Sequence, residues 1–193
     1  MTSSISQSWI RIESWLARHA PRTFAVLGPP AERSSITAAE QAIGLPFPEA
    51  LVESLLRHNG TGHCRLLPPF WSLLDTEGIA RAWQIRTTIH GDETAAAQEA
   101  VADEQYGPWW HKQWIPIALD GSGDYLILDQ RPHPRRGRIG NADHETGCSF
   151  SHHPMRTSLP ALLDATATAL ETREPVDGYL PVVRDDGHLD WDF

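Results

Sequence analysis

The order of the periodic segments constrains the fold of this chain most strongly. Apolar residues recur at helical spacing in residues 5–16 and again in residues 159–170. Between them, the apolar segments 114–119 and 125–129 are typical of strands and are joined by a glycine-rich turn. Helical patterns therefore come first, strands cluster centrally, and a helix returns. This order predicts an α+β fold with a central, mostly antiparallel sheet flanked by helices, and not a doubly wound α/β fold.

Capping and breaker signals predict three more helices, over residues 37–44, 48–58 and 76–89. Thr37 and Glu40 have the spacing of a capping box. Glu53 and Arg57 lie four residues apart and are expected to pair on the outer face of their helix. We expect one domain over residues 1–172 and a C-terminal tail over 173–193.

Two segments are less typical of such a domain. The tail is expected to hold a short hairpin that turns at Asp186-Gly187. Residues 92–105 are rich in alanine and acidic side chains, which predicts an exposed helix or an ordered insert.

The charge is negative and unevenly spread. The 193 residues carry a net charge of −9, and residues 65–130 hold ten acidic side chains against four basic ones. An acidic surface repels phosphate backbones, so we do not expect direct nucleic-acid binding. The same surface would accelerate encounter with a basic protein. Solubility alone also explains a net negative charge.

The chain is expected to be cytoplasmic. No apolar run approaches the length of a membrane span, and the first residues lack the pattern of a secretory signal. Cys64 and Cys148, the two cysteines, show neither metal-ligand nor redox spacing. No cofactor or metal is expected, and the oligomeric state is left open.

In the segment 120–129, Asp124 and Asp129 are candidates for metal or acid–base chemistry. Five residues apart along a strand, however, their side chains point to opposite faces. Turn chemistry accounts for the aspartates and glycines. Ser122 lies between glycines, but a strand follows where a nucleophile elbow requires a helix.

The ten histidines give no better support for catalysis. Those nearest to a cluster are His111, His144, His152 and His153, and none shows metal-ligand spacing. His63 adjoins Cys64, but neighbours along a chain do not make a catalytic pair. A non-enzymatic protein is predicted.

Aromatic and acidic residues together suggest a protein-binding site. Trp109 and Trp110 follow the acidic segment and lie in a loop. An exposed tryptophan beside carboxylates is typical of a binding hot spot. The predicted partner-binding residues are Trp109, Trp110, Asp120 and Asp124, with Asp103 and Glu104 steering the approach. The alternative is that both rings fold back onto the sheet.

The order of motifs resembles a known family. Ile36, Glu40 and the sequence Gly44-Leu-Pro-Phe-Pro48 precede a leucine-rich helix that ends at Asn59-Gly60. The sequence Trp114-Ile-Pro-Ile-Ala follows, then Asp120-Gly-Ser-Gly-Asp124. Over residues 8–172 this succession is similar to the Smi/Knr cell-wall-regulator family, in the SUKH superfamily of bacterial immunity proteins.

The resemblance implies an α+β domain without catalytic residues. Bacterial members mostly bind and neutralise toxins, often nucleases, and fungal members are signalling scaffolds. The recurring residues Gly44, Pro46, Asn59, Gly60 and Gly123-Asp124 shape loops, so no contact residue carries over. We therefore expect an immunity protein that binds a basic toxin domain directly. The alternatives are a regulatory scaffold without a toxin partner, and a metal-assisted hydrolase using histidines with Asp124 and Asp129.

Overall fold

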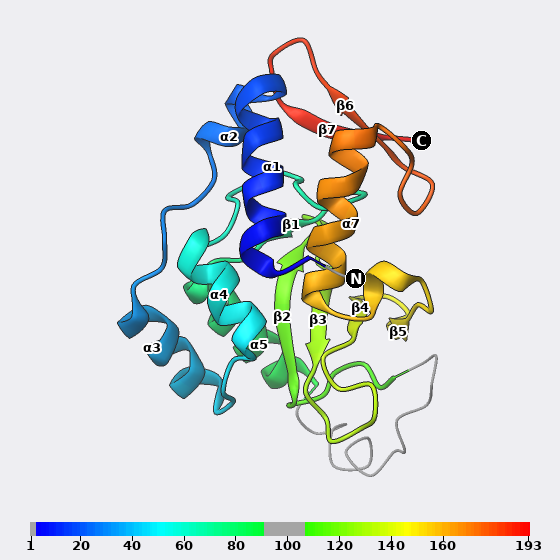
Figure 1. The fold of residues 1–193 in the computed structure, drawn as a ribbon. Coiled ribbons are helices and arrows are strands. Elements are labelled where there is room, and N and C mark those ends of the chain that lie inside the picture. The colour runs from blue at the N-terminus through cyan, green and yellow to red at the C-terminus, as the bar shows by residue number, and fades with distance from the viewer. Residues whose placement is uncertain (1–2, 91–106) are drawn as a thin grey trace.

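The computed structural model describes residues 3–90 and 107–193 and shows the predicted α+β fold (Figure 1). Its α-helices are α1 (Ile5–His19), α2 (Pro21–Ala25), α3 (Arg33–Ile43), α4 (Glu49–Arg57), α5 (Thr76–Ile89) and α7 (Leu159–Thr172). Its strands are β1 (Ser72–Leu73), β2 (Trp114–Leu119), β3 (Tyr125–Asp129), β4 (Ile139–Asp143), β5 (Gly147–Phe150), β6 (Leu180–Val183) and β7 (Leu189–Asp192). A short 3₁₀ helix, η1 (Pro154–Arg156), precedes α7.

The central sheet is antiparallel throughout and follows the chain order β1-β2-β3-β4-β5. The register between β2 and β3 shifts between Pro116 and Ala118, which marks a bulge. Because neighbouring strands are joined by short connections, the β2–β3 turn and the β4–β5 turn lie at the same end of the sheet. This topology brings together two turns that are 20 residues apart in the sequence.

The helices α1 and α7 lie side by side (Figure 1), and their buried apolar residues share one core with those on one face of β2 and β3. The predicted apolar stripe of α1 is buried, with Trp9, Ile12 and Leu16 all at 0% exposure. The indole nitrogen of Trp9 donates to Ser54 Oγ of α4 at 3.0 Å. Removing this face from water is the main stabilising contribution of α1, because apolar burial drives folding.

The opposite face of the sheet has its own apolar cluster. Its buried members are Trp110, Trp114, Ile127, Ala142, Cys148 and Phe150. Trp114 packs edge-on against Trp110 and Phe150, with ring centroids about 6 Å apart (5.9 and 6.0 Å). Edge-to-face packing of this kind stabilises aromatic clusters beyond the area that they bury. The sheet is therefore apolar on both faces.

The predicted hairpin of the tail is formed by β6 and β7. Its turn reaches α2, where the backbone N–H of Arg22 donates to the carbonyl of Gly187. Trp191 is buried, and its indole nitrogen donates to the carbonyl of Arg65 at 3.0 Å. The hairpin thus packs onto the N-terminal part of the chain (Figure 1). The domain boundary at residue 172 stays a prediction.

Two predicted local pairs are wrong. The helix α3 already begins at Arg33, so Thr37 lies inside it and caps nothing. Glu40 instead accepts a hydrogen bond from the backbone N–H of Phe47 at 2.7 Å and holds the extended segment after Gly44. Glu40 therefore binds the segment that follows α3, and not the start of the helix as the capping box predicted.

The second wrong pair is Glu53 with Arg57. Glu53 accepts hydrogen bonds from the backbone and hydroxyl of Ser6 at the start of α1, at 3.0 and 2.6 Å. Arg57 pairs with Glu13 of α1. Both side chains therefore connect α4 to α1 and do not pair with each other.

Across residues 3–90 and 107–193, none of the helices has the length and apolar character needed to cross a membrane.

Candidate partner-binding surface

The β2–β3 turn is built by its own aspartates. Asp120 Oδ1 accepts hydrogen bonds from the backbone N–H groups of Ser122 and Asp124, and Oδ2 accepts one from the Ser122 hydroxyl at 2.6 Å. Burial opposes ionisation of Asp120, but these hydrogen bonds outweigh it and hold its pKa below the ordinary value. Gly121 and Gly123 have φ of 93° and 116°, which side chains rarely adopt. Asp120 is thus first of all a turn residue.

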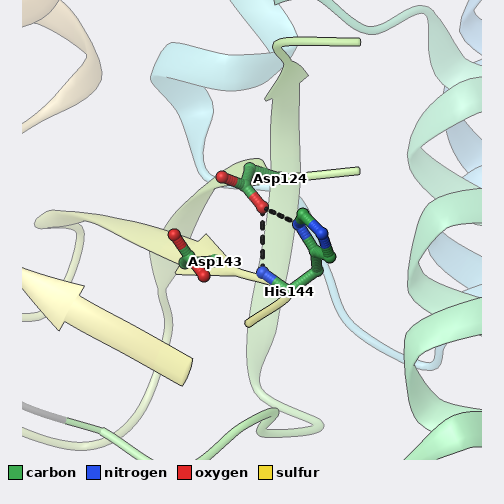
Figure 2. Close-up of side chains that lie close together, drawn as sticks. All are labelled: Asp124, Asp143 and His144. Atoms are coloured by element: carbon green, nitrogen blue, oxygen red, sulfur yellow. Dashed lines mark hydrogen bonds and ion pairs between the residues drawn. The ribbon is translucent and has the colours of Figure 1, made fainter. Parts of the chain in front are cut away.

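The β4–β5 turn lies against the first one through Asp124 and His144. Figure 2 shows the Asp124 carboxylate directed at His144, with Asp143 beside them. Asp124 Oδ1 accepts from the backbone N–H of His144 at 2.8 Å and contacts its ring Nδ1 at 2.7 Å. Asp143 Oδ1 accepts from the backbone N–H groups of Glu145 and Thr146. The two turns form one hydrogen-bonded unit.

Arg86 of α5 holds the two turns through hydrogen bonds to their backbone. The side chain is buried at 5% exposure, and its Nη2 donates to the carbonyl of Gly123 at 2.8 Å and to that of Ala142 at 3.3 Å. Its guanidinium also lies over the ring of Tyr125, 5.4 Å from the centroid. The sequence reasoning missed Arg86. The available signal was an arginine in line with Ile79 and Ala82 on the apolar face of a predicted helix.

The two loop tryptophans have different surroundings. Trp110 is 1% exposed and its indole nitrogen donates to Thr87 Oγ1 at 3.0 Å, so it belongs to the core and offers no surface to a partner. The prediction of Trp110 as a contact residue is corrected on this ground. Trp109 is 39% exposed and stacks on His90 with ring centroids 6.0 Å apart. Trp109 therefore remains a candidate contact residue.

These elements define one region, which we name the turn surface. It comprises the end of α5 (85–90), Trp109, and the turns 120–124 and 143–147. Trp109 lies against the β4–β5 turn, because a Cβ on Gly147 would stand 3.8 Å from its ring. Ile85 and Ile89, one helical turn apart, are 47% and 66% exposed. The turn surface thus combines exposed apolar side chains with carboxylates.

The predicted residues are partly brought together. Trp109, Asp120 and Asp124 belong to the turn surface, and whether they bind a partner stays a prediction. Asp103 and Glu104, and the expected helix over 92–105, lie outside the described residues. Glu145, which the sequence reasoning did not single out, has a side chain 78% exposed, whereas the three aspartates of the two turns are half-buried.

The carboxylate of Asp129 is engaged in ion pairs. This residue is fully buried, and its carboxylate pairs with Arg131 at 2.7 Å and with Arg138 at 3.2 Å. Asp124 and Asp129 thus have separate partners, His144 for the first and the two arginines for the second. Burial raises the pKa of the Cys64 thiol to about 11 and raises that of Cys148 further, so both thiols are unreactive at neutral pH.

Among residues 3–90 and 107–193, Asp124, Asp143 and His144 come closest to forming a metal site. One possible ligand atom from each lies within 4.8 Å of the others. The carboxylates, however, already accept backbone hydrogen bonds that close the turns. A metal would have to compete with these bonds and with the proton on His144. Turn formation therefore explains the cluster.

His144 gives a pH-dependent test of the Asp124 contact. The hydrogen bond to Asp124 is the main cause of a pKa raised above the ordinary 6.5. Since the folded pKa is raised, the stabilisation is fully present below pH 6.5 and is lost as pH rises through the folded pKa. An NMR titration of His144 is expected to give a midpoint above 6.5, and Asp124→Asn should lower it. A midpoint at or below 6.5 in the unaltered protein would contradict the contact.

Comparisons with known proteins show which family this chain resembles. The SMI1/KNR4 family model (SUKH-1) matches residues 30–151, which is more than half of the chain. The chain is similar to a Schizosaccharomyces pombe protein described as "Cell wall biosynthesis/cell cycle regulator smi1", at 27% identity over 146 residues. The match covers 67% of this chain but 29% of that relative, so the chain spans less than a third of its length. The resemblance seen in the motifs is confirmed, and the chain belongs to the SMI1/KNR4 family (SUKH-1).

Proposed function

We propose that this protein is a non-catalytic binding protein of the immunity type, which neutralises a basic toxin domain by covering it with the turn surface. The observation that carries the proposal is Trp109, held half-exposed by His90 beside two acidic turns. A tryptophan with a fixed ring and a partly open face is what a binding hot spot requires. The cytoplasm is the compartment that we propose for it.

The electrostatics support a basic partner. The net charge of −9 attracts a positively charged protein and speeds encounter. Nuclease-type toxins bind phosphate, so their active sites are basic. On the turn surface, Asp143 keeps a lowered pKa through backbone hydrogen bonds from Glu145 and Thr146, and therefore stays ionised at neutral and mildly acidic pH.

A regulatory scaffold is the second candidate, and one specific observation favours it. The Schizosaccharomyces pombe relative is described as a regulator of cell wall biosynthesis and the cell cycle. A scaffold would use the same kind of surface for a housekeeping protein. The two candidates therefore differ in the partner and not in the chemistry of recognition.

Co-expression decides between them. The gene adjacent to the one encoding this chain would be expressed in a test bacterium, alone and together with this protein, and viable cells counted. Rescue from a lethal neighbour is the result expected for an immunity protein. A harmless neighbour, or a lethal one without rescue, would favour the scaffold.

Glu145→Lys is expected to weaken binding of a basic partner without unfolding the protein. Reversing one exposed rim charge should lower the affinity by about 1 kcal/mol, mostly through slower association, and the loss should shrink at high salt. Calorimetry and stopped-flow mixing measure both. Because Asp124 holds the two turns together, Glu145 is the cleaner position to alter.

Glu77→Lys is the matched control, since Glu77 is exposed at the opposite end of α5. It changes the net charge equally. Equal losses of binding affinity in the two variants would show that only the overall charge matters, and would contradict binding through the turn surface.

A further inference from the structure

A basic cavity lies on the side of the protein formed by the β3–β4 connection, the segment after β5, and η1. Its volume is about 370 Å³, and four of the residues that line it are the arginines Arg135, Arg136, Arg138 and Arg156. All of its lining residues in the described part of the chain are neutral or basic. We name it the arginine pocket. Four of the chain's 16 Lys and Arg residues therefore line one cavity, although the net charge of the chain is −9.

Two of the four guanidinium groups, those of Arg136 and Arg138, are held in place by the protein around them. Arg138 donates to the buried Asp129 at 3.2 Å and lies 3.6 Å from the centre of the Phe150 ring. Arg136 donates through Nε to Gln130 Oε1 at 3.2 Å. Side chains fixed in this way lose little conformational freedom when an anion binds.

Arg156 supplies the observation that points to a ligand. Its Nη1 is buried and has no hydrogen-bond partner within residues 3–90 and 107–193. Burial lowers the pKa of Arg156, and electrostatic attraction by Asp177 opposes that shift. A buried guanidinium nitrogen without an acceptor is normally satisfied by a partner, and the oxygens of an oxyanion match the planar donors of an arginine.

A second cavity of about 180 Å³ adjoins the first and shares Ser151 and Arg156 with it. Asn141 lines this second cavity, and its side-chain Oδ1 is buried with no partner among the described residues. Asp177 is the acidic member of the lining. An unsatisfied amide and a carboxylate are suited to hydroxyl groups, because both can accept from O–H donors.

We propose that the arginine pocket binds the phosphate group of a small organic phosphate, with the hydroxyl-bearing part of the ligand lying toward Asn141 and Asp177. A phosphate monoester carries up to two negative charges and offers three acceptor oxygens, which suits several guanidinium groups better than one carboxylate does. The volume lies within the range of small-molecule sites and exceeds what a single ion fills. The pocket is distinct from the turn surface, so this inference does not rest on the proposed toxin binding.

Calorimetry of the full chain tests the proposal with ribose 5-phosphate, inorganic phosphate and ribose as probes. Ribose 5-phosphate is expected to bind, inorganic phosphate to bind more weakly, and ribose not to bind. No heat with ribose 5-phosphate at millimolar concentration would overturn the proposal. Inorganic phosphate binding as tightly as ribose 5-phosphate would overturn the organic ligand, since the free ion alone would then fill the site.

Variants assign the binding to the pocket. Arg156→Met should weaken the binding of ribose 5-phosphate at least about tenfold and leave the melting temperature unchanged or raised, because it removes a buried donor that has no hydrogen-bond partner. Arg136→Gln should also weaken binding and provides a second test at a more exposed position. Arg81→Met, on the exposed side of α5, is the matched control and should bind as the unaltered protein does. Unchanged binding by Arg156→Met and Arg136→Gln would contradict the assignment.

Discussion

Replacing Asp129 by alanine is expected to destabilise the protein by about 3–5 kcal/mol, because it leaves two buried arginines without their shared carboxylate. The side chains of Asp129, Arg131 and Arg138 are 1%, 8% and 6% exposed. Arg131 lies over both Trp114 and Phe150, so the ion cluster closes the apolar cluster on this face of the sheet. Urea unfolding followed by tryptophan fluorescence measures the loss.

Two controls make the Asp129 result specific. Asp164→Ala breaks an ion pair to Arg11 that also has an N–O distance of 2.7 Å but is partly exposed, and it should cost about 1 kcal/mol or less. Adding Arg131→Leu to Asp129→Ala should recover part of the stability, because an apolar side chain replaces an uncompensated charge. A loss at Asp129 no larger than at Asp164 would contradict the role of the buried cluster.

The stability that the ion pairs of Asp129 contribute is expected to be lost at low pH. Burial opposes ionisation of Asp129, but hydrogen bonds from Arg131 and Arg138 outweigh it, so its pKa lies below the ordinary 3.8. A lowered folded pKa means that the stabilisation is present above pH 3.8 and is lost as pH falls through the folded value. Asp129→Ala should therefore lose less stability at strongly acidic pH than at pH 7.

Trp110→Ala is expected to lower the free energy of unfolding by about 3–5 kcal/mol, whereas Trp109→Ala should lower it by about 1 kcal/mol or less. Trp110 is buried, packs against Trp114, and donates a hydrogen bond to Thr87. Trp109 is 39% exposed and contacts mainly His90 and the β4–β5 turn. Denaturant unfolding of both variants measures the contrast. Similar losses at the two positions would contradict their assignment to core and surface.

Helices and strands with a regular spacing of apolar residues were predictable, because those residues must all face the core. The apolar stripe of α1 and the limits of β2 and β3 agree with the structure, since each buries a regular set of side chains. Capping signals were less reliable. Glu40 has the right spacing for a capping box, but the backbone N–H of Phe47 offers it a tertiary partner instead.

The candidate site was predictable only in part, for a physical reason. A loop has no period, so Trp109 and Trp110 look alike in the sequence even though their neighbours differ. The contact of Asp124 with His144 joins residues 20 apart, and it depends on two turns meeting at one end of the sheet. Arg86 stabilises that meeting from a third element. Such convergence follows from topology and leaves no local pattern.

If the turn surface binds a basic protein partner, the affinity of Trp109→Ala for that partner must fall. With the toxin identified by co-expression, calorimetry would compare the unaltered protein with Trp109→Ala and with Phe70→Ala. Phe70 is 40% exposed and packs near the C-terminal hairpin, so it is a control of matched exposure. We expect Trp109→Ala to lose about 2 kcal/mol of binding free energy and Phe70→Ala to lose none. Equal affinities for Trp109→Ala and the unaltered protein would contradict the claim.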